Sequence, residues 1–185
     1  MIHHTKLKFR ECLKRRRETK YIVVHHTAVT DDEQPVTLVH QWHLDRKTKD
    51  GKPWAGIGYH YYIRRSGEIY QGRPRNKKGS HVFVDEAHRY NSITIGVCFE
   101  GDFRTEVMSE KQLEASVMLL SVLSLGYGNI DICKHSYLDK RTTCPGKNFP
   151  FPELIKRVHD QKQRFIDLYG DPCEVNYKFL LKKLD

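Results

Sequence analysis

The chain has 185 residues, 38% of them hydrophobic and 30% charged, with a net charge of +9. This length suits one domain whose core is large enough to need no disulfide bonds. The composition is that of an ordinary, rather polar globular protein, and no apolar run approaches the length that spans a bilayer, which excludes a transmembrane protein.

The positive charge is concentrated at the N-terminus. Residues 1–20 hold eight Lys or Arg and two Glu, so +6 of the net +9 lies there. Such a basic segment indicates a polyanionic partner: a nucleic acid, an anionic membrane or an anionic cell-wall polymer. A solvated helix that needs its charge only for solubility is an equal alternative. The segment has no apolar core and therefore does not have the form of a secretory signal.

The five cysteines, at positions 12, 98, 133, 144 and 173, are an odd number without a repeating spacing. Because no secretory signal is evident, we expect reduced thiols. In that setting an important cysteine is more often a metal ligand or a nucleophile than half of a disulfide. The count alone does not single out one of the five.

The predicted elements alternate between helices and strands. In chain order we expect a short amphipathic helix over 5–18, a buried strand over 21–26, a helix over 35–45, a hairpin over 59–72, a strand over 93–101, a helix after the capping box of Ser109 and Gln112, a short strand over 129–135 and a last helix over 150–170. The long polar stretch 73–92 is expected to be a functional loop. This order predicts an α/β fold, a single domain with a central mixed β-sheet flanked by helices.

Two of the predicted strands end in histidine. Functional groups gather at strand ends in open α/β sheets, so His25 or His26 is expected to meet His135. Cys144 follows by one loop, which can return its thiolate to the same place. Two imidazoles and one thiolate leave a fourth position open, as in a catalytic zinc site, and this donor set favours zinc over magnesium or calcium. The spacing alone is weak, and taken singly each histidine is more readily explained as a core residue.

Five blocks occur in a fixed order: VVHHTA (23–28), GIGYHYYI (56–63), GSH (79–81), YNSITIGVCFEGDF (90–103) and KHSYLDKRTTCPG (134–146). Together they resemble the N-acetylmuramoyl-L-alanine amidase family, which includes phage lysozyme-like amidases and peptidoglycan recognition proteins. The resemblance runs from about Lys20 to about Leu154. It implies a zinc-dependent hydrolase that cuts the amide bond between N-acetylmuramic acid and L-alanine in peptidoglycan.

The resemblance also implies the residues of the site. The ligands of one Zn²⁺ ion would be the first histidine of the pair, the histidine of KHSYLD and the cysteine before Pro-Gly: His25, His135 and Cys144. Tyr59 would supply the catalytic hydroxyl. Thr142, where some members have lysine, would help to hold the substrate carbonyl, as in the recognition-protein branch.

Two further residues are candidates for contact with the substrate. His81 lies in the long loop where members of the family have a histidine that lines the substrate groove, and a plain loop histidine is the alternative. Trp54 stands in a glycine-flanked loop and is the better of the two tryptophans for stacking on a glycan. His60 is expected in the core, and His40 and His43 have helical spacing but no third ligand.

One position departs from part of the family. Amidases of cell-wall recycling have a glutamate where this chain has Cys98, so a tyrosine-type site is expected here. Glu100 should point to the same side of the strand. It is an alternative proton-transfer residue, although a glutamate that only forms ion pairs is the stronger interpretation.

The expected organisation has three parts: a basic N-terminal helical extension (1–19), an amidase catalytic domain (20–155) and a C-terminal helix and tail packed on the domain (156–185). A phage-type endolysin fits best, made in the cytoplasm, released by a holin and acting on the cell wall, where the basic segment would bind anionic polymers. The alternatives are a host autolysin, a recycling amidase and a non-catalytic peptidoglycan-binding receptor. Nucleic-acid binding through residues 6–20 would rest on charge alone, so neither a specific nucleic acid nor membrane insertion is expected.

Overall fold

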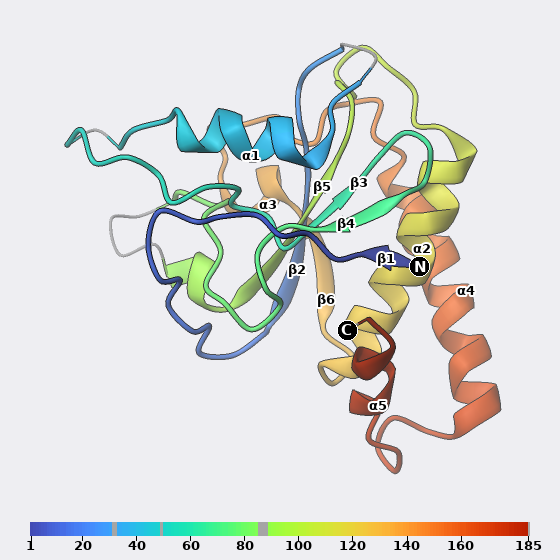
Figure 1. Ribbon diagram of the computed structural model, residues 1–185. Coiled ribbons are helices and arrows are strands. Elements are labelled where there is room, and N and C mark those ends of the chain that lie inside the picture. Colours follow the sequence, from blue (N-terminus) through green and yellow to red (C-terminus); the bar gives the residue numbers. More distant parts are fainter. Residues whose placement is uncertain (31–32, 49, 85–88, 185) are drawn as a thin grey trace.

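A mixed sheet forms the centre of the computed structural model, which describes residues 1–30, 33–48, 50–84 and 89–184 (Figure 1). Within these ranges the strand order is β1-β4-β3-β5-β2-β6. The strands are β1 (Ile2–His3), β2 (Tyr21–His26), β3 (Tyr61–Ile63), β4 (Ile69–Gln71), β5 (Thr94–Phe99) and β6 (Asp131–Lys134). Only the β3–β4 hairpin is antiparallel, and the other neighbours run parallel. The predicted α/β domain with a central mixed sheet is confirmed.

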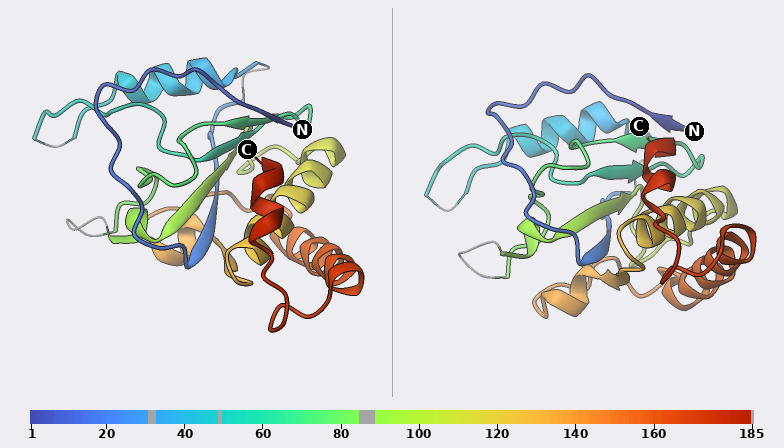
Figure 2. Two further views of the ribbon diagram at one scale, coloured as in Figure 1. Left: turned by 60° about the horizontal axis from the view of Figure 1, so that its bottom comes forward. Right: turned by 90° about the horizontal axis from the view of Figure 1, so that it is seen from below.

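Helices cover both faces of the sheet. They are α1 (Val36–Leu44), η1 (Arg89–Ser92), α2 (Glu110–Gly126), α3 (His135–Leu138), α4 (Phe151–Tyr169), α5 (Lys178–Leu181) and η2 (Lys182–Leu184). Figure 2 shows α1 on one side of the sheet and α2 with α4 on the other. No helix of the described ranges combines the length and the apolar composition needed to cross a bilayer.

The sheet divides the core into two main clusters. On the side of α2 and α4, buried residues of the strands, such as Ile22 and Val97, pack against helical residues such as Leu119. On the side of α1, Val39 packs against Tyr62 and Cys98. The β-branched run IVV of β2 is buried on both faces, as is typical of a central parallel strand.

The helix α2 begins with half of the predicted capping box. The Ser109 hydroxyl accepts a hydrogen bond from the backbone N–H of Gln112 at 3.1 Å. The Gln112 amide does not return to Ser109. It is fully buried and donates to the carbonyls of Ile63 and Glu100, both at 3.0 Å. Gln112 therefore connects the first turn of α2 to β3 and to the residue that follows β5, instead of completing the box.

The predicted N-terminal helix over residues 5–18 is wrong. The segment is extended and lies across the side of the domain that carries α1, with β1 paired to β4 (Figures 1 and 2). Its backbone is bound by a distant loop: the Arg16 N–H donates to the carbonyl of Asn76, and the Lys78 N–H donates to the carbonyl of Lys14. The four-residue spacing of Phe9 and Leu13 is a local helical signal, and these tertiary hydrogen bonds override it.

Arg16 anchors this extended segment. Its guanidinium is buried and lies 3.1 Å from His60 Nε2, and it donates to the hydroxyls of Thr19 and Tyr127. It also lies over the Tyr127 ring, 5.6 Å from the centroid. Because burial disfavours the charged form, the pKa of Arg16 is lowered.

The last long helix predicted from the sequence is present in the C-terminal part of the chain. The helix α4 spans Phe151–Tyr169, close to the expected 150–170, and packs along α2. After it, Tyr177 and Leu180 pack against Val122 and Leu125 of α2. The boundaries drawn at residues 19/20 and 155/156 stay predictions, because the chain packs continuously across both.

Four buried histidines serve as hydrogen-bond acceptors within the fold. Each uses Nδ1 to accept a backbone N–H: His26 from Phe103 at 3.2 Å, His40 from Ile57 at 3.2 Å, His43 from Gly58 at 2.9 Å and His60 from Gly96 at 3.0 Å. The core position predicted for His60 is confirmed. Burial lowers the pKa of His26 to about 4, and the pKa values of His43 and His60 to about 3.

We expect the metal-free protein to lose stability between pH 7 and pH 5. In this window the unfolded chain binds protons at histidines of ordinary pKa, whereas the folded chain does not, so the free energy of unfolding falls as the pH falls. The expected loss is about 2 kcal/mol for each of His26, His43 and His60. Urea unfolding at the two pH values measures it.

The matched control is His43→Asn, whose side-chain oxygen can accept the Gly58 N–H but does not titrate. Its loss of stability between pH 7 and pH 5 should be smaller than that of the parent by about 2 kcal/mol. An equal loss in the two proteins would show that His43 is not held neutral by the fold.

Candidate metal centre and active site

Three potential metal ligands converge at the edge of the sheet where β2 and β6 end. His25 is the second-last residue of β2, His135 is the first residue of α3 directly after β6, and Cys144 lies in the loop that follows. The ligand atoms of the three residues all lie within 4.8 Å of one another. The His25 and His135 rings are 4.5 Å apart, and Cys144 Sγ is 3.9 Å from His25 Nδ1. The structure thus brings together the three ligands that the sequence predicts.

Backbone hydrogen bonds hold Cys144 beside His135. The Cys144 carbonyl accepts from the N–H of Ser136, the residue after His135, at 2.9 Å. The Cys144 N–H donates to the hydroxyl of Thr142 at 3.1 Å. The backbone carbonyl and the backbone N–H of Cys144 are therefore both held by hydrogen bonds, which position the thiol.

The donor atoms are electrostatically suited to a cation. Burial lowers the pKa values of His25 and His135, so both imidazoles are neutral and keep a lone pair for coordination at pH 7. Burial raises the pKa of Cys144 to about 12. A thiolate is therefore unfavourable at this position unless a positive charge lies beside it.

The cluster also passes a test of hydrogen bonding. His135 Nε2 is buried and has no hydrogen-bond partner among the described residues. A buried polar atom without a partner is costly, and an ion would satisfy it. Two imidazole nitrogens and one thiolate fit a tetrahedral Zn²⁺ with one position left for water or substrate.

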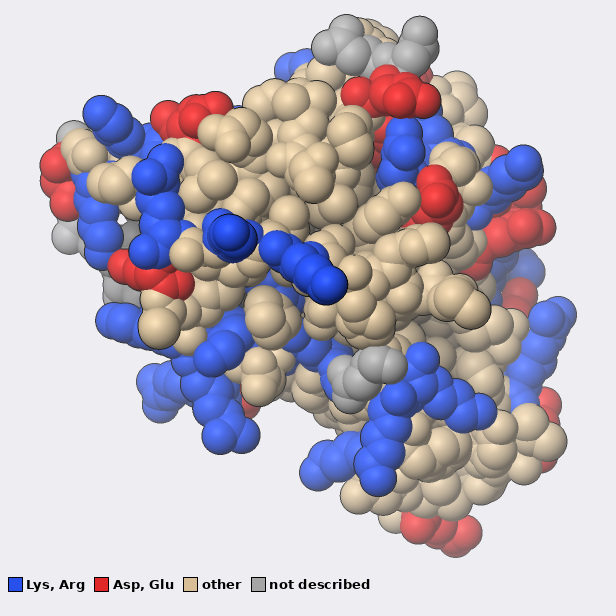
Figure 3. All heavy atoms as spheres, viewed as in Figure 1, with Lys and Arg blue, Asp and Glu red and all other residues tan. Residues whose placement is uncertain are grey.

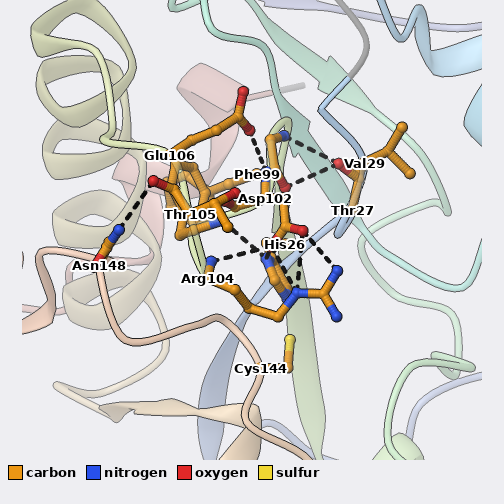
Figure 4. A network of polar contacts seen from close by, with 12 residues as sticks. His26, Thr27, Val29, Phe99, Asp102, Arg104, Thr105, Glu106, Cys144 and Asn148 are labelled. Carbon is orange, nitrogen blue, oxygen red and sulfur yellow. Dashed lines mark hydrogen bonds and ion pairs between the residues drawn. The ribbon is translucent and has the colours of Figure 1, made fainter.

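His26 points away from this cluster, although it is adjacent to His25. Successive side chains of a strand face opposite sides, and the His26 ring contacts Asp102, whose Oδ1 lies 3.6 Å from Nδ1 (Figure 4). Asp102 in turn accepts from the Arg104 guanidinium. The backbone of His26 nevertheless contributes to the site, because its hydrogen bond to the Cys144 sulfur lowers the pKa of that thiol and so favours the thiolate.

Tyr59 lies beside the ligands. Its ring is 5.2 Å from the His25 ring, and the Cys98 thiol is a neighbour of its hydroxyl. Burial raises the pKa of Tyr59, so the hydroxyl stays protonated and can donate a hydrogen bond. Thr142 uses its oxygen to accept from Cys144, which leaves its own proton free to donate.

The two predicted substrate contacts lie in different surroundings. His81 is only 9% exposed, and its Nδ1 is 2.9 Å from His25 Nε2, so it packs against the back of a ligand. Trp54 is partly exposed, with its ring 5.2 Å from the His43 ring and the Arg46 guanidinium 5.6 Å from its centroid. Contact of either residue with substrate stays a prediction.

Glu100 has a structural role. It is 1% exposed and accepts the backbone N–H groups of Gln34 and Arg65 at 2.7 and 2.8 Å. It also forms ion pairs with the Arg64 and Arg65 side chains. The ion-pairing interpretation of Glu100 agrees with these contacts, and none of them leads to the ligand cluster.

Two residues that hold His81 against the ligand His25 were not predicted from the sequence. Thr94 and Asn91 both contact His81, through its Nε2 and its backbone N–H respectively. Both lie in the block YNSITIG, which carried the family resemblance, but their roles depend on a meeting of three separate segments that no local pattern encodes.

Comparisons with known proteins agree with this geometry. The family model described as N-acetylmuramoyl-L-alanine amidase matches residues 15–147, a range that contains all three ligands of the cluster. Peptidoglycan-recognition protein 2 of Holotrichia diomphalia is 33% identical over 107 residues, which cover 55% of this chain and 52%, or about half, of that relative. The endolysin of Klebsiella phage KP32 is 32% identical over 138 residues, 71% of this chain and 83% of the endolysin.

A solved structure shares the fold over most of its length. It is titled endolysine N-acetylmuramoyl-L-alanine amidase LysCS from Clostridium intestinale URNW. The TM-score is 0.74 at 31% sequence identity, and the alignment covers 86% of this chain and 95% of that chain. The likeness therefore extends beyond the ligand loops to most of the chain.

Replacement of Cys144 by alanine is expected to weaken zinc binding by more than about 100-fold, because loss of a direct ligand costs more than loss of the outer partners that orient ligands. Competition with a chromophoric chelator measures the affinity. Cys133→Ala is the matched control, since Cys133 lies two residues before His135 but outside the cluster. Equal affinities of the two variants would contradict the assignment of Cys144 as a ligand.

Proposed function

Because this chain belongs to the N-acetylmuramoyl-L-alanine amidase family, we propose that it uses one Zn²⁺ ion to hydrolyse the bond between N-acetylmuramic acid and L-alanine in peptidoglycan. The observation that carries the proposal is the cluster of His25, His135 and Cys144, of which His25 and Cys144 are buried and His135 is partly buried. It is a three-ligand donor set with one position left open. Peptidoglycan is accordingly the proposed substrate. The products are a free carboxylate on the lactyl group of the glycan and a peptide stem with a free amino group on alanine.

The chain's own residues suit this reaction. His25, His135 and Cys144 would hold the ion, which supplies Lewis-acid activation of the scissile carbonyl and of the attacking water. Tyr59 would donate a hydrogen bond to the oxyanion that develops on the carbonyl, and its raised pKa keeps the proton in place at neutral pH. Thr142, two residues before Cys144, would donate to the same carbonyl.

The biological setting that fits best is a phage-type endolysin that reaches the wall after release by a holin. The similarity to the Klebsiella phage KP32 endolysin supports this setting. A host autolysin is a second possibility, and a recycling amidase is less favoured because Cys98 stands where those enzymes have glutamate. A non-catalytic receptor is disfavoured by the presence of all three ligands, since such receptors typically lack one of them.

The test is digestion of purified peptidoglycan. We expect new amino groups on alanine without new reducing sugars, loss of activity with a chelator, and recovery when Zn²⁺ is added back. Tyr59→Phe should lower kcat by about 100-fold with unchanged zinc affinity, as loss of one oxyanion donor does. Tyr70→Phe is the matched control, because that hydroxyl contacts Glu68.

Different failures have different meanings. New reducing ends would identify a glycosidase, and binding of peptidoglycan without cleavage would identify a receptor. Full activity of the chelated protein or of Cys144→Ala would reject the role of zinc while leaving the substrate in place.

The basic N-terminal segment is the proposed contact with anionic wall polymers. Its exposed cations are Lys6, Lys8, Arg10, Lys14, Arg15, Arg17 and Lys20. The isolated bridge between Arg15 and Lys77 brings a further lysine beside them. Figure 3 shows Lys and Arg side chains gathered along the left and lower part of the face drawn. A concentration of one sign of charge attracts polyanions with an affinity that falls as salt is added.

Charge reversal tests this contact. Binding of Lys14→Glu/Arg15→Glu/Arg17→Glu to intact walls should be weaker by at least about tenfold at low salt, because each cation near an anionic surface contributes about 1 kcal/mol. The control reverses three exposed lysines elsewhere, Lys111, Lys182 and Lys183. On walls stripped of anionic polymers the difference between the two proteins should disappear. If intact walls bind both proteins equally well, and DNA retains only the parent, the partner is a nucleic acid instead.

A further inference from the structure

We propose that His81 is a positioning residue that fixes the tautomer and the ring orientation of His25, through a directed hydrogen-bond chain that ends on the backbone carbonyl of Tyr90. The chain has three links: His25 Nε2 to His81 Nδ1 at 2.9 Å, His81 Nε2 to Thr94 Oγ1 at 3.2 Å, and Thr94 Oγ1 to the Tyr90 carbonyl at 2.7 Å. This role differs from the substrate contact expected of His81, and it rests on the proposed zinc site.

The last link decides the direction of the whole chain. A carbonyl oxygen only accepts, so the single hydroxyl proton of Thr94 is donated to Tyr90. Thr94 Oγ1 must then accept from His81, which places the proton of that neutral imidazole on Nε2 and leaves a lone pair on Nδ1. His81 Nδ1 consequently accepts, and the His25 proton is on Nε2.

This direction leaves His25 Nδ1 unprotonated on the side of the other two ligands. Cys144 Sγ lies 3.9 Å from this atom. In the opposite direction of donation His25 would carry its proton on Nδ1, between the ligands, where it would block coordination. A ligand histidine oriented through its second nitrogen is the usual way in which proteins fix a metal site. Here the orienting group is another histidine.

The fold provides a fitted space for the His81 ring. A Cβ added at Gly96 would lie 2.7 Å from ring atoms of His81, and one added at Gly79 would lie 2.5 Å from its Cδ2. Both distances are too short for any side chain, so these two glycines allow the close approach. The Asn91 side chain holds the backbone, accepting from the N–H groups of His81 and Val82 and donating to the Val82 carbonyl.

The pair Thr94→Val and Thr94→Ser tests the chain without touching a ligand. Valine has the shape of threonine but no acceptor, whereas serine keeps the hydroxyl. Two-bond ¹H–¹⁵N correlation spectra of the metal-free proteins report the tautomers directly. We expect His25 and His81 to carry their protons on Nε2 in the parent and in Thr94→Ser. In Thr94→Val the His25 proton should shift to Nδ1, because His81 Nε2 has lost its acceptor.

Zinc affinity is the second measurement. We expect Thr94→Val to bind Zn²⁺ about 10-fold more weakly or worse, in the range found for partners that orient ligands, and Thr94→Ser to match the parent. An Nδ1–H tautomer of His25 in the parent would overturn the proposal. So would a loss of affinity in Thr94→Val without a change of tautomer, which would point to a packing defect.

A second substitution guards against a folding failure of Thr94→Val. The side chain of His81→Gln offers a carbonyl to His25 and an amide proton to Thr94, so it should retain zinc affinity within a few fold, whereas His81→Leu should not. Equal affinities of these two variants would overturn the proposal. Because the tautomer is read without metal or substrate, its outcome is independent of whether the chain cleaves peptidoglycan.

Discussion

Parallel pairing sets Val24 of β2 opposite Lys134 of β6, so the chain leaves both strands in the same direction and at the same height. The next residues are His25 and His135, which therefore emerge side by side at one edge of the sheet. Two further groups lie against this pair: the Cys144 loop closes on it through Ser136, and Tyr59 approaches from the segment that leads into β3. An antiparallel β6 would carry the second imidazole to the opposite edge.

Histidine has two different uses in this fold, and burial is common to both. His43 and His60 use Nδ1 to accept a backbone N–H and so hold loops against the sheet. His25 faces the other ligands with the same atom because His81 occupies its Nε2. The chemical group is the same in each case. The difference lies in the surroundings of Nδ1. In His43 and His60 this nitrogen accepts a backbone N–H, whereas in His25 it faces the other ligands and is open to an ion.

Much of the fold could be predicted because the local spacing of apolar residues indicates where strands and helices form. The buried strand 21–26, the hairpin around Gly67 and the long helix after Ser109 each have the spacing of their class. The helix expected at 5–18 failed since its apolar spacing carried no information about a loop sixty residues away. The contact of His81 with His25 could not be predicted for a related reason: its surroundings are made by Gly79, Asn91 and Gly96, which meet only in the folded chain.

Charge balance links the site's burial to its proposed chemistry. The same burial that keeps His25 and His135 neutral raises the pKa of Cys144 to about 12, so the metal-free cluster carries no charge. A divalent cation would displace the thiol proton and leave a net charge of +1 on the cluster, so binding would be coupled to proton release. One positive charge in a site of low polarity complements the single negative charge of a tetrahedral oxyanion. A third imidazole in place of Cys144 would leave +2, whereas a second thiolate would leave none, so the ligand set suits the oxyanion in charge as well as in geometry.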